Sequence, residues 1–353
     1  MKTSYNTVIG TGGIGTGIIF KLEGNHNLGR NESRMAYLSE QRDFCKQHII
    51  LHYVSSLLKQ IKLPVKVFPI GAVGNDDPGA ICLKEMKLAG MDTRFVRVLN
   101  MTKSLFAVCF QYPDNSGGNI TQKQSASEKV KSDDIQNSFY QIVKNNLKIK
   151  PMILAAPEVP LASRAKLLKL GRKIRGFNAA SFSTEEIKRV KNTNILKDID
   201  LLSLNMDEAN ALAGTSYRSL PDRTIKKCCD SANKINPGLF LTVTNGSRGI
   251  YGCRNRNVEF IPALRVKVAN TAGAGDAFLA GIMLGFIKGL PFISKAEPSC
   301  LKLGRLISAI SVTSPHTIHF GLNLKTLREF AKEQKQTGIF NSLVRKNEFL
   351  EHG

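Results

Sequence analysis

Short apolar runs alternate along the chain with longer segments in which apolar residues recur at helical spacing. Such runs predict buried strands, because a strand of a parallel sheet is covered on both faces and is apolar almost throughout. We predict these strands at residues 7–10, 152–156, 173–178, 200–205, 239–244 and 249–253. The repeated alternation of strand and helix predicts an α/β fold with a mostly parallel sheet covered on both faces.

Helices are predicted between the strands, where apolar residues fall on one face. Residues 43–60 have this spacing, a helix opens at Asp77-Pro78 after a strand, and Ser132 caps a helix that runs to Leu147. Since neither a long linker nor an internal repeat interrupts the alternation, we expect a single domain over residues 1–353.

Two segments are more polar than the rest. Residues 16–22 are β-branched and alternating, which predicts a second strand, and residues 23–36 are rich in Gly, Asn and charged residues. This polar stretch is either a solvated loop or a loop that recognises a ligand with many hydroxyl groups. Residues 102–124 predict a strand, a turn and a returning strand.

Composition narrows the class of protein. The chain is 42% hydrophobic, and no apolar run approaches the ~20 residues of a membrane span. The start, M-K-T-S-Y-N-T-V-I-G, lacks the apolar region of a signal peptide. The seven cysteines form no C-x-x-C pair, which indicates reduced thiols rather than zinc or disulfides. We therefore expect a cytoplasmic protein that does not contact a membrane.

The chain is strongly basic, with 50 Lys and Arg against 28 Asp and Glu and a net charge of +22. This favours anionic partners such as nucleotides, phosphorylated substrates or nucleic acid. The basic residues are spread along the chain, however, and no basic block is interleaved with aromatic residues. We therefore do not expect nucleic acid as a partner.

The stretch N-T-A-G-A-G-D at residues 270–276 carries the chemistry. Gly273, Ala274 and Gly275 form a small turn, and the apolar spacing after it places the turn at a helix N-terminus. Unpaired N–H groups and the positive end of the helix dipole make such a turn an anion site. Asp276 adds a base beside the anion, as phosphoryl transfer to an alcohol requires. Taken alone, the stretch also fits a tight loop that caps a buried helix.

Two further motifs allow more than one interpretation. Glycines at 10, 12, 13 and 15 match a dinucleotide-binding fingerprint, but a strand pattern follows where that fingerprint requires a helix. We interpret this turn as a strand connection close to a ligand. Asn205 and Glu208 follow a predicted strand, where a carboxylate can hold Mg²⁺ through water. The same pair also fits a capping box, and both interpretations stay open.

These motifs resemble those of the ribokinase-like (PfkB) carbohydrate kinase family. Residues 270–276 match its signature, Asp or Asn followed by T-x-G-A-G-D, and residues 205–208 resemble its N-x-x-E motif. Residues 71–79 are similar to its G-x-V-G-x-D-x-x-G phrase, and residues 244–249 to its T-x-G-x-x-G turn. The resemblance implies a ribokinase-like three-layer sandwich with a small β lid, built from about residues 15–35 and 102–124.

The resemblance also implies an ATP- and Mg²⁺-dependent kinase that phosphorylates a hydroxyl group of a sugar, a sugar derivative or a nucleoside. Asp276 would be the catalytic base, the amides of Gly273, Ala274 and Gly275 the anion hole, and Glu208 the metal-organising residue. A second copy of the chain is a further candidate partner. ATP would contact Asn178, Asn205, Thr244, Gly246, Thr271 and Thr313.

The acceptor site departs from the family pattern. Gly15 stands about where the family carries an Asp, and R-D-F-C-K-Q-H at residues 42–48 stands where it carries G-G-x-x-x-N. The side chains of Arg30, Arg34 or Lys46 would suit an anionic acceptor. We expect the acceptor to contact Gly12, Gly13, Asn25, Arg30 and Asn31.

Two questions follow from these departures. Asn270 replaces the Asp of ribokinase-type members, which leaves a requirement for a monovalent cation open. The rewritten acceptor motif and the basic charge keep an alternative function, a non-catalytic nucleotide-binding or nucleic-acid-associated module of the same fold.

Overall fold

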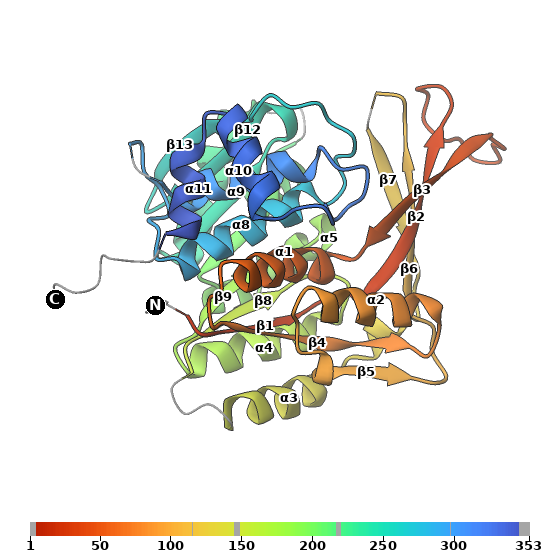
Figure 1. Ribbon diagram of the computed structural model, residues 1–353, viewed down its shortest axis with the longest axis horizontal. Coiled ribbons are helices and arrows are strands. Elements are labelled where there is room, and N and C mark those ends of the chain that lie inside the picture. The colour runs from red at the N-terminus through yellow and green to blue at the C-terminus, as the bar shows by residue number, and fades with distance from the viewer. Residues whose placement is uncertain (1–4, 115, 145–148, 217–219, 297, 346–353) are drawn as a thin grey trace.

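The computed structural model describes residues 5–345 apart from residues 115, 145–148, 217–219 and 297. A nine-stranded sheet crosses the molecule in the order β13-β12-β11-β10-β9-β8-β1-β4-β5 (Figure 1). Neighbouring strands are parallel from β11 to β5, and β12 and β13 are antiparallel. This confirms the predicted mostly parallel sheet. The strands are β1 (Thr7–Thr11), β4 (Lys66–Gly74), β5 (Val96–Leu99), β8 (Pro151–Ala155), β9 (Phe177–Ala180), β10 (Leu201–Asn205), β11 (Phe240–Thr244), β12 (Gly249–Arg254) and β13 (Asn257–Pro262).

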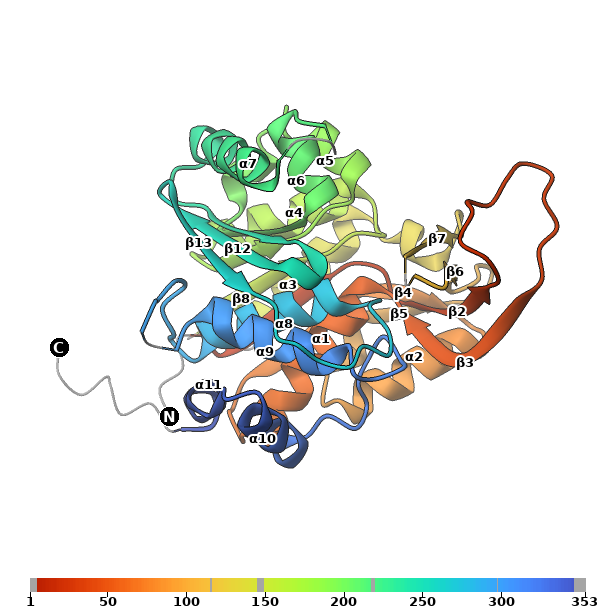
Figure 2. The same ribbon diagram turned by 90° about the horizontal axis from the view of Figure 1, so that it is seen from above.

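Helices cover both faces of this sheet, as the edge-on arrangement in Figure 2 shows. Successive residues of a strand point to opposite faces, so Val8 and Ile9 of β1 enter separate apolar cores. One core is built with α1 (Lys46–Gln60), α2 (Asp77–Leu88), α8 (Ala274–Ile287), α9 (Cys300–Ser311), α10 (Leu324–Glu333) and α11 (Thr337–Val344). The other is built with α3 (Ser132–Lys144), α4 (Leu161–Lys173), α5 (Thr184–Val190), α6 (Met206–Ala213) and α7 (Pro221–Ile235). The predicted three-layer sandwich is therefore confirmed.

A second, smaller sheet projects from one end of the large one (Figure 1). We call it the lid. Its strands lie in the order β3-β2-β6-β7, and β2 and β6 are parallel. The strands are β2 (Gly15–Leu22), β3 (Ala36–Phe44), β6 (Leu105–Gln111) and β7 (Gly117–Thr121).

Strand β3 was not predicted from the sequence, and the lid boundary at residue 35 is wrong. The chain continues as lid strand to Phe44, and the helix expected from Asp43 begins at Lys46. Tyr37, Leu38 and Glu40 are all exposed, so β3 lacks the one-sided apolar pattern that marks a strand. Its pairing with β2 holds it in place instead. The last predicted residues of the helix from Ser132 to Leu147 lie outside the described residues.

Within the described residues, no helix is both long enough and apolar enough to span a bilayer.

Helix α8 is held in place by a close crossing with α9. A Cβ added to Gly281 of α8 would lie 2.7 Å from the Cα of Gly304 in α9. The two helix backbones therefore meet where neither has a side chain. Because α8 begins at the predicted anion turn, this crossing sets the position of that turn.

We predict opposite effects on stability from the same substitution at two helical glycines. Gly281→Ala forces the α8–α9 backbones apart and should lower the free energy of unfolding by about 1–3 kcal/mol. Gly338→Ala in α11 meets open space and should raise it by about 0.5–1 kcal/mol through helix propensity. Urea denaturation followed by circular dichroism measures both; equal effects at the two positions would contradict the close crossing.

Candidate active site

The carboxyl ends of the parallel strands meet at one edge of the large sheet, where ligands of such sheets bind. Glu158 follows β8, Asn205 ends β10, and Glu208 lies in the first turn of α6, which follows β10 directly. Glu158 shares a cavity with residues 270–273 and with Asp276 at the start of α8. The strand ends and the turn before α8 therefore face one space.

The turn before α8 has the conformation that the sequence predicts. Gly273 is the N-cap residue with a φ of +80°, a left-handed conformation that residues with a side chain rarely adopt. Ala274 donates its N–H to the carbonyl oxygen of Thr271 at 3.2 Å, which closes the turn. Gly275 is exposed, and a Cβ there would meet no atom within 4 Å. The first N–H groups of a helix lack partners within it, so this turn, residues 271–275, can accept an anion. We call it the anion turn.

A cavity of about 300 Å³ lies between the anion turn and the lid. The lid contributes residues of β6, including Cys109 and Phe110, and the segment 116–119 at its turn. The junction of β3 with α1 contributes residues 43–46. Asn270, the anion turn and Asp276 form the opposite wall, so a small ligand in the cavity would lie against the predicted base.

The charges of Asp276 and Lys46 shift each other's pKa. Burial raises the pKa of Asp276 to about 6, Lys46 opposes this rise, and Asp43 adds to it. The Asp276 carboxylate is in turn the main cause that raises the pKa of Lys46 to about 12. A carboxylate with a pKa near 6 is a suitable general base close to neutral pH.

Two more carboxyl groups belong to the same charged cluster. Burial raises the pKa of Glu158 to about 7, and Lys46 opposes the rise. Burial also raises the pKa of Glu208 to about 7, again opposed by Lys46. Both groups interact with Asp276, which adds to each rise. Lys46 thus lowers the pKa of all three carboxyl groups, while burial raises each of them above its ordinary value.

Glu208 fits a site for hydrated Mg²⁺. It forms the capping box with Asn205: Glu208 donates its N–H to Asn205 Oδ1 at 2.9 Å, and Glu208 Oε2 accepts from Asn205 N at 2.8 Å. The capping box and the metal role are therefore compatible, because the box fixes the carboxylate at the end of β10. Among the described residues, no group of three or more His, Cys, Asp or Glu side chains could hold a metal ion by itself. Mg²⁺ keeps several waters and is bound through one or two carboxylates together with substrate phosphates, so the fixed carboxylate of Glu208 suits it.

Glu158 is held in an unfavourable backbone conformation beside the cavity. Its φ is +77°, which is uncommon for a residue with a side chain and costs about 1–3 kcal/mol. A Cβ added to Gly13 would clash with the Glu158 carboxylate. Gly13 thus leaves room for the Glu158 side chain. Gly12 leaves room for Ala156, because a Cβ at Gly12 would lie 2.7 Å from the Cβ of Ala156. Neither glycine is among the residues that line the cavity.

Asp43 lies at the cavity and is the penultimate residue of lid strand β3. Its carboxylate Oδ2 accepts a hydrogen bond from the Cys109 thiol of β6 at 3.1 Å. Burial is the main cause that raises the pKa of Asp43. The lid therefore brings a carboxylate, together with a thiol, to the acceptor side of the cavity.

Three residues predicted to bind the acceptor lie elsewhere. Asn25, Arg30 and Asn31 are exposed in the loop between β2 and β3, and none lines the cavity. In the same loop, Arg34 forms an ion pair with Glu32 and donates a hydrogen bond to the carbonyl oxygen of His26 (3.0 Å). The polar groups of this loop bond to one another, and the contact of Asn25, Arg30 and Asn31 with an acceptor stays a prediction.

The prediction that Asn178 ends a strand beside the nucleotide is also wrong. Residues 173–176 end α4 instead, where Gly176 donates its N–H to the carbonyl oxygen of Gly171 at 2.8 Å. Asn178 is the second residue of β9 and is fully buried. Its amide nitrogen donates to the carbonyl oxygens of Leu168 and Asp198, so its role is to join β9 to neighbouring segments.

The other residues predicted to contact ATP come from three places: the end of β11, the anion turn and the end of α9. Thr244 ends β11 and stands in register with Asn205. Gly246 follows in an exposed turn with a φ of +51°, and a Cβ there would meet no atom within 4 Å. Thr271 lines the cavity. Thr313 follows α9 and donates its hydroxyl to the carbonyl oxygen of Ile310 at 2.7 Å.

Sequence reasoning missed Asp43 and Glu158 and assigned Lys46 only to an anionic acceptor. A signal for Glu158 was present, because it closely follows the strand predicted at 152–156. Asp43 and Lys46 flank the end of β3, which the sequence pattern did not mark as a strand.

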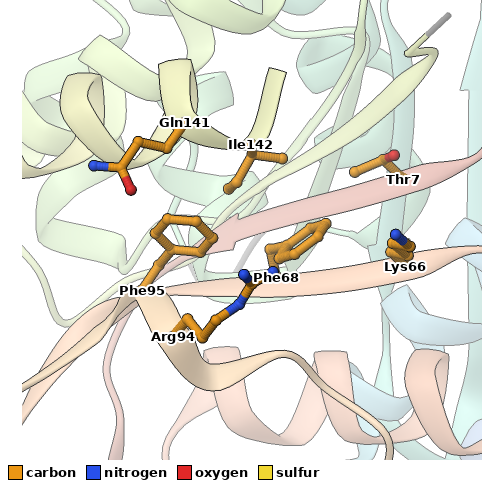
Figure 3. Close-up of a pocket in the computed structure, with 7 residues that line it drawn as sticks. All are labelled: Thr7, Lys66, Phe68, Arg94, Phe95, Gln141 and Ile142. Atoms are coloured by element: carbon orange, nitrogen blue, oxygen red, sulfur yellow. The ribbon is translucent and has the colours of Figure 1, made fainter. Parts of the chain in front are cut away.

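A second cavity, of about 310 Å³, lies at the opposite edge of the large sheet (Figure 3). Thr7 and Lys66, the first residues of β1 and β4, line it together with Arg94. Arg94 is committed to Asp92, at 2.6 Å between Nη2 and Oδ2. None of the residues that line this cavity is a carboxylate, so it offers no base, and we assign the chemistry to the cavity under the lid.

Comparison with known proteins agrees with this geometry. The model of the pfkB family carbohydrate kinases matches residues 50–323. Ribokinase of Bacillus subtilis is 24% identical over 254 residues, which is 72% of this chain and 77% of that protein.

Solved structures share the fold. The Burkholderia thailandensis nucleoside kinase in complex with inosine has a TM-score of 0.69 at 17% identity, covering 92% of this chain and 97% of that one. An Escherichia coli protein solved with ATP and Mg²⁺ has a TM-score of 0.67 at 16% identity, covering 93% of this chain and 99% of that one. Because the family match spans most of the chain, and the anion turn with its Asp276 is formed as the family signature implies, this protein belongs to the pfkB family of carbohydrate kinases.

Proposed function

We propose that the protein transfers the γ-phosphoryl group of ATP to a hydroxyl group of a neutral sugar, polyol or nucleoside bound under the lid. One observation carries this proposal: Asp276, with its raised pKa, lies beside the anion turn and Lys46 in a cavity that the lid lines on one side. A base, an anion site and a confined acceptor space are the parts that phosphoryl transfer to an alcohol requires.

Each residue of the cluster has a distinct task. Asp276 accepts the proton of the acceptor hydroxyl as its oxygen attacks phosphorus. The N–H groups of Gly273 and Gly275 stabilise the charge on the transferred group, an effect typically worth about 10²–10³-fold per donor in comparable sites. Those of Ala272 and Ala274 shape the turn instead, through bonds to Asn270 and Thr271. Lys46 holds Asp276 ionised at neutral pH by its positive charge.

Mg²⁺, when bound with ATP, neutralises charge on the phosphate oxygens. Glu208 would hold it through water, since the capping box with Asn205 fixes this carboxylate at the end of β10. Thr244 and Gly246 lie at and just after the neighbouring strand end, and their proposed role is to contact the nucleotide.

The charges of the cavity favour a neutral acceptor over an anionic one. Three carboxyl groups line it, those of Asp43, Glu158 and Asp276, and Lys46 is the one cation among its lining residues. A phosphorylated acceptor would face these carboxylates, and like charges brought together cost several kcal/mol. Carboxylates accept hydrogen bonds, so they suit an acceptor rich in hydroxyl groups.

We predict that a panel of acceptors assayed with Mg-ATP yields turnover on a neutral sugar, polyol or nucleoside. The phosphorylated form of the same compound should be poorer by about tenfold or more in kcat/KM, because of charge repulsion. Asp276→Asn should lower kcat by about 10²–10⁴-fold while ATP binding persists. Release of ADP, measured by a coupled assay, gives both results.

Glu40→Gln serves as the control for charge removal, since Glu40 is exposed on β3 and does not line the cavity. If no acceptor in the panel causes release of ADP while ATP still binds, the result would favour the non-catalytic alternative. A preferred phosphorylated acceptor would contradict the neutral-acceptor proposal alone.

We also predict the pH dependence of turnover. The base acts ionised, so kcat/KM should fall as the pH drops through about 7 to 6, where Glu158, Glu208 and Asp276 take up protons. Lys46→Met removes the cation that lowers these pKa values, so it should move the acid limb to higher pH. Lys84→Met, on the exposed side of α2, should leave the limb in place. An acid limb near pH 4 in the wild type would contradict the raised pKa of the base, and an unmoved limb in Lys46→Met would refute the role of Lys46.

A further inference from the structure

The segment after α9 touches both halves of the catalytic cavity. Residues 314–317, which we call the strap, follow α9 and lie between the anion turn and the end of lid strand β3. The strap makes side-chain and backbone contacts to Asn270 and Gly273 on one side and to residues 42–44 on the other. It is therefore a physical link between the phosphate side and the acceptor side of the cavity.

On the phosphate side, the link is the side chain of Asn270. Its Oδ1 accepts the N–H of Ala272 at 2.9 Å, and its Nδ2 donates to the carbonyl oxygen of Pro315 at 2.9 Å. A backbone N–H can only donate, so the bond from Ala272 fixes the oxygen of the amide and turns the nitrogen toward Pro315. Asn270 is 6% exposed, so these two bonds replace its hydration.

Gly273 tightens the same contact. A Cβ at Gly273 would lie 2.6 Å from the carbonyl oxygen of Thr317. Only glycine therefore lets the anion turn rest directly against the strap.

On the acceptor side, the link is made by Thr317 and His316. The hydroxyl of Thr317 accepts the N–H of Phe44 at 3.1 Å and donates to the carbonyl oxygen of Arg42 at 3.4 Å. Arg42 donates its own N–H to Nδ1 of His316 at 3.4 Å. These bonds flank Asp43, which lines the cavity.

We propose that the Asn270 amide and the Thr317 hydroxyl make the strap a neutral connection that fixes the anion turn to the root of the lid without a monovalent cation. The catalytic part of this inference rests on the proposed kinase function. The protein should accordingly need no K⁺, and Thr317 is a positioning residue that sets Asp43 at the acceptor.

The residues at this place do not fit a cation. Hard cations bind oxygen ligands, whereas Asn270 presents N–H to the carbonyl oxygen of Pro315. An Asp at this position, as in ribokinase-type members, would instead place two oxygens opposite each other. That arrangement requires a cation or a proton between them, and Asn270 removes the requirement.

The test compares wild type and Asn270→Asp in K⁺ and in tetramethylammonium, which is too large to enter the gap. Wild type should have the same rate and the same midpoint of thermal unfolding in both salts. Asn270→Asp should be slower by about tenfold in tetramethylammonium, because a buried carbonyl oxygen loses its donor, and K⁺ should restore the rate and raise the midpoint. Asn323→Asp, which keeps the N-cap of α10, controls for the added charge.

A wild-type rate or midpoint of thermal unfolding that rises with K⁺ would overturn the proposal. This wild-type comparison tests the proposal even if Asn270→Asp fails to fold. An Asn270→Asp protein that matches wild type in both salts would overturn it as well. If no acceptor is found, the midpoints still test the strap, so its failure and that of the kinase function are distinguishable.

Thr317→Val tests the acceptor side. It should raise KM for the acceptor more than KM for ATP in either salt, because it releases the segment that carries Asp43. A lowered midpoint with both KM values unchanged would show a merely structural role and would overturn the positioning of Asp43 by Thr317.

Discussion

The attraction between the Asp276 carboxylate and the Lys46 ammonium is the interaction on which the rest of the site depends. A carboxylate in a confined cavity would take up a proton near neutral pH and lose its function as a base, since burial disfavours charge. Lys46 opposes this for Asp276, Glu158 and Glu208 together. The pair also explains the architecture, because Lys46 is the first residue of α1 and Asp276 lies in the first turn of α8.

The lid and the large sheet have complementary parts in this account. Strand ends and the α8 turn supply the rigid phosphate side, where Glu208 is fixed by its capping box and Gly273 by its left-handed conformation. The lid supplies Asp43 and Cys109 to the wall of the cavity that faces the anion turn. The strap joins the two sides through Asn270 and Thr317, so that the base and the acceptor keep one geometry.

The sequence predicted the parts of the site that depend on local structure. The anion turn and the capping box are each set by residues close in sequence, so their patterns were readable. Asp43 and Glu158 reach the cavity only through long-range pairing, of β3 with β2 and of β8 within the large sheet. Asn178 was misplaced because a helix end, closed by Gly176, resembled the start of a strand. The pattern of a polar loop does not reveal where the loop points, so the sequence did not show that Asn25, Arg30 and Asn31 lie outside the cavity lining.

The most direct test of the account is to follow the γ-phosphoryl group itself by ³¹P NMR, with Mg-ATP and a neutral acceptor. We expect the γ-phosphorus signal of ATP to be replaced by that of a phosphate monoester on the acceptor, with ADP formed in equal amount. Formation of inorganic phosphate alone, with the acceptor unchanged, would contradict transfer to a hydroxyl group held beside Asp276.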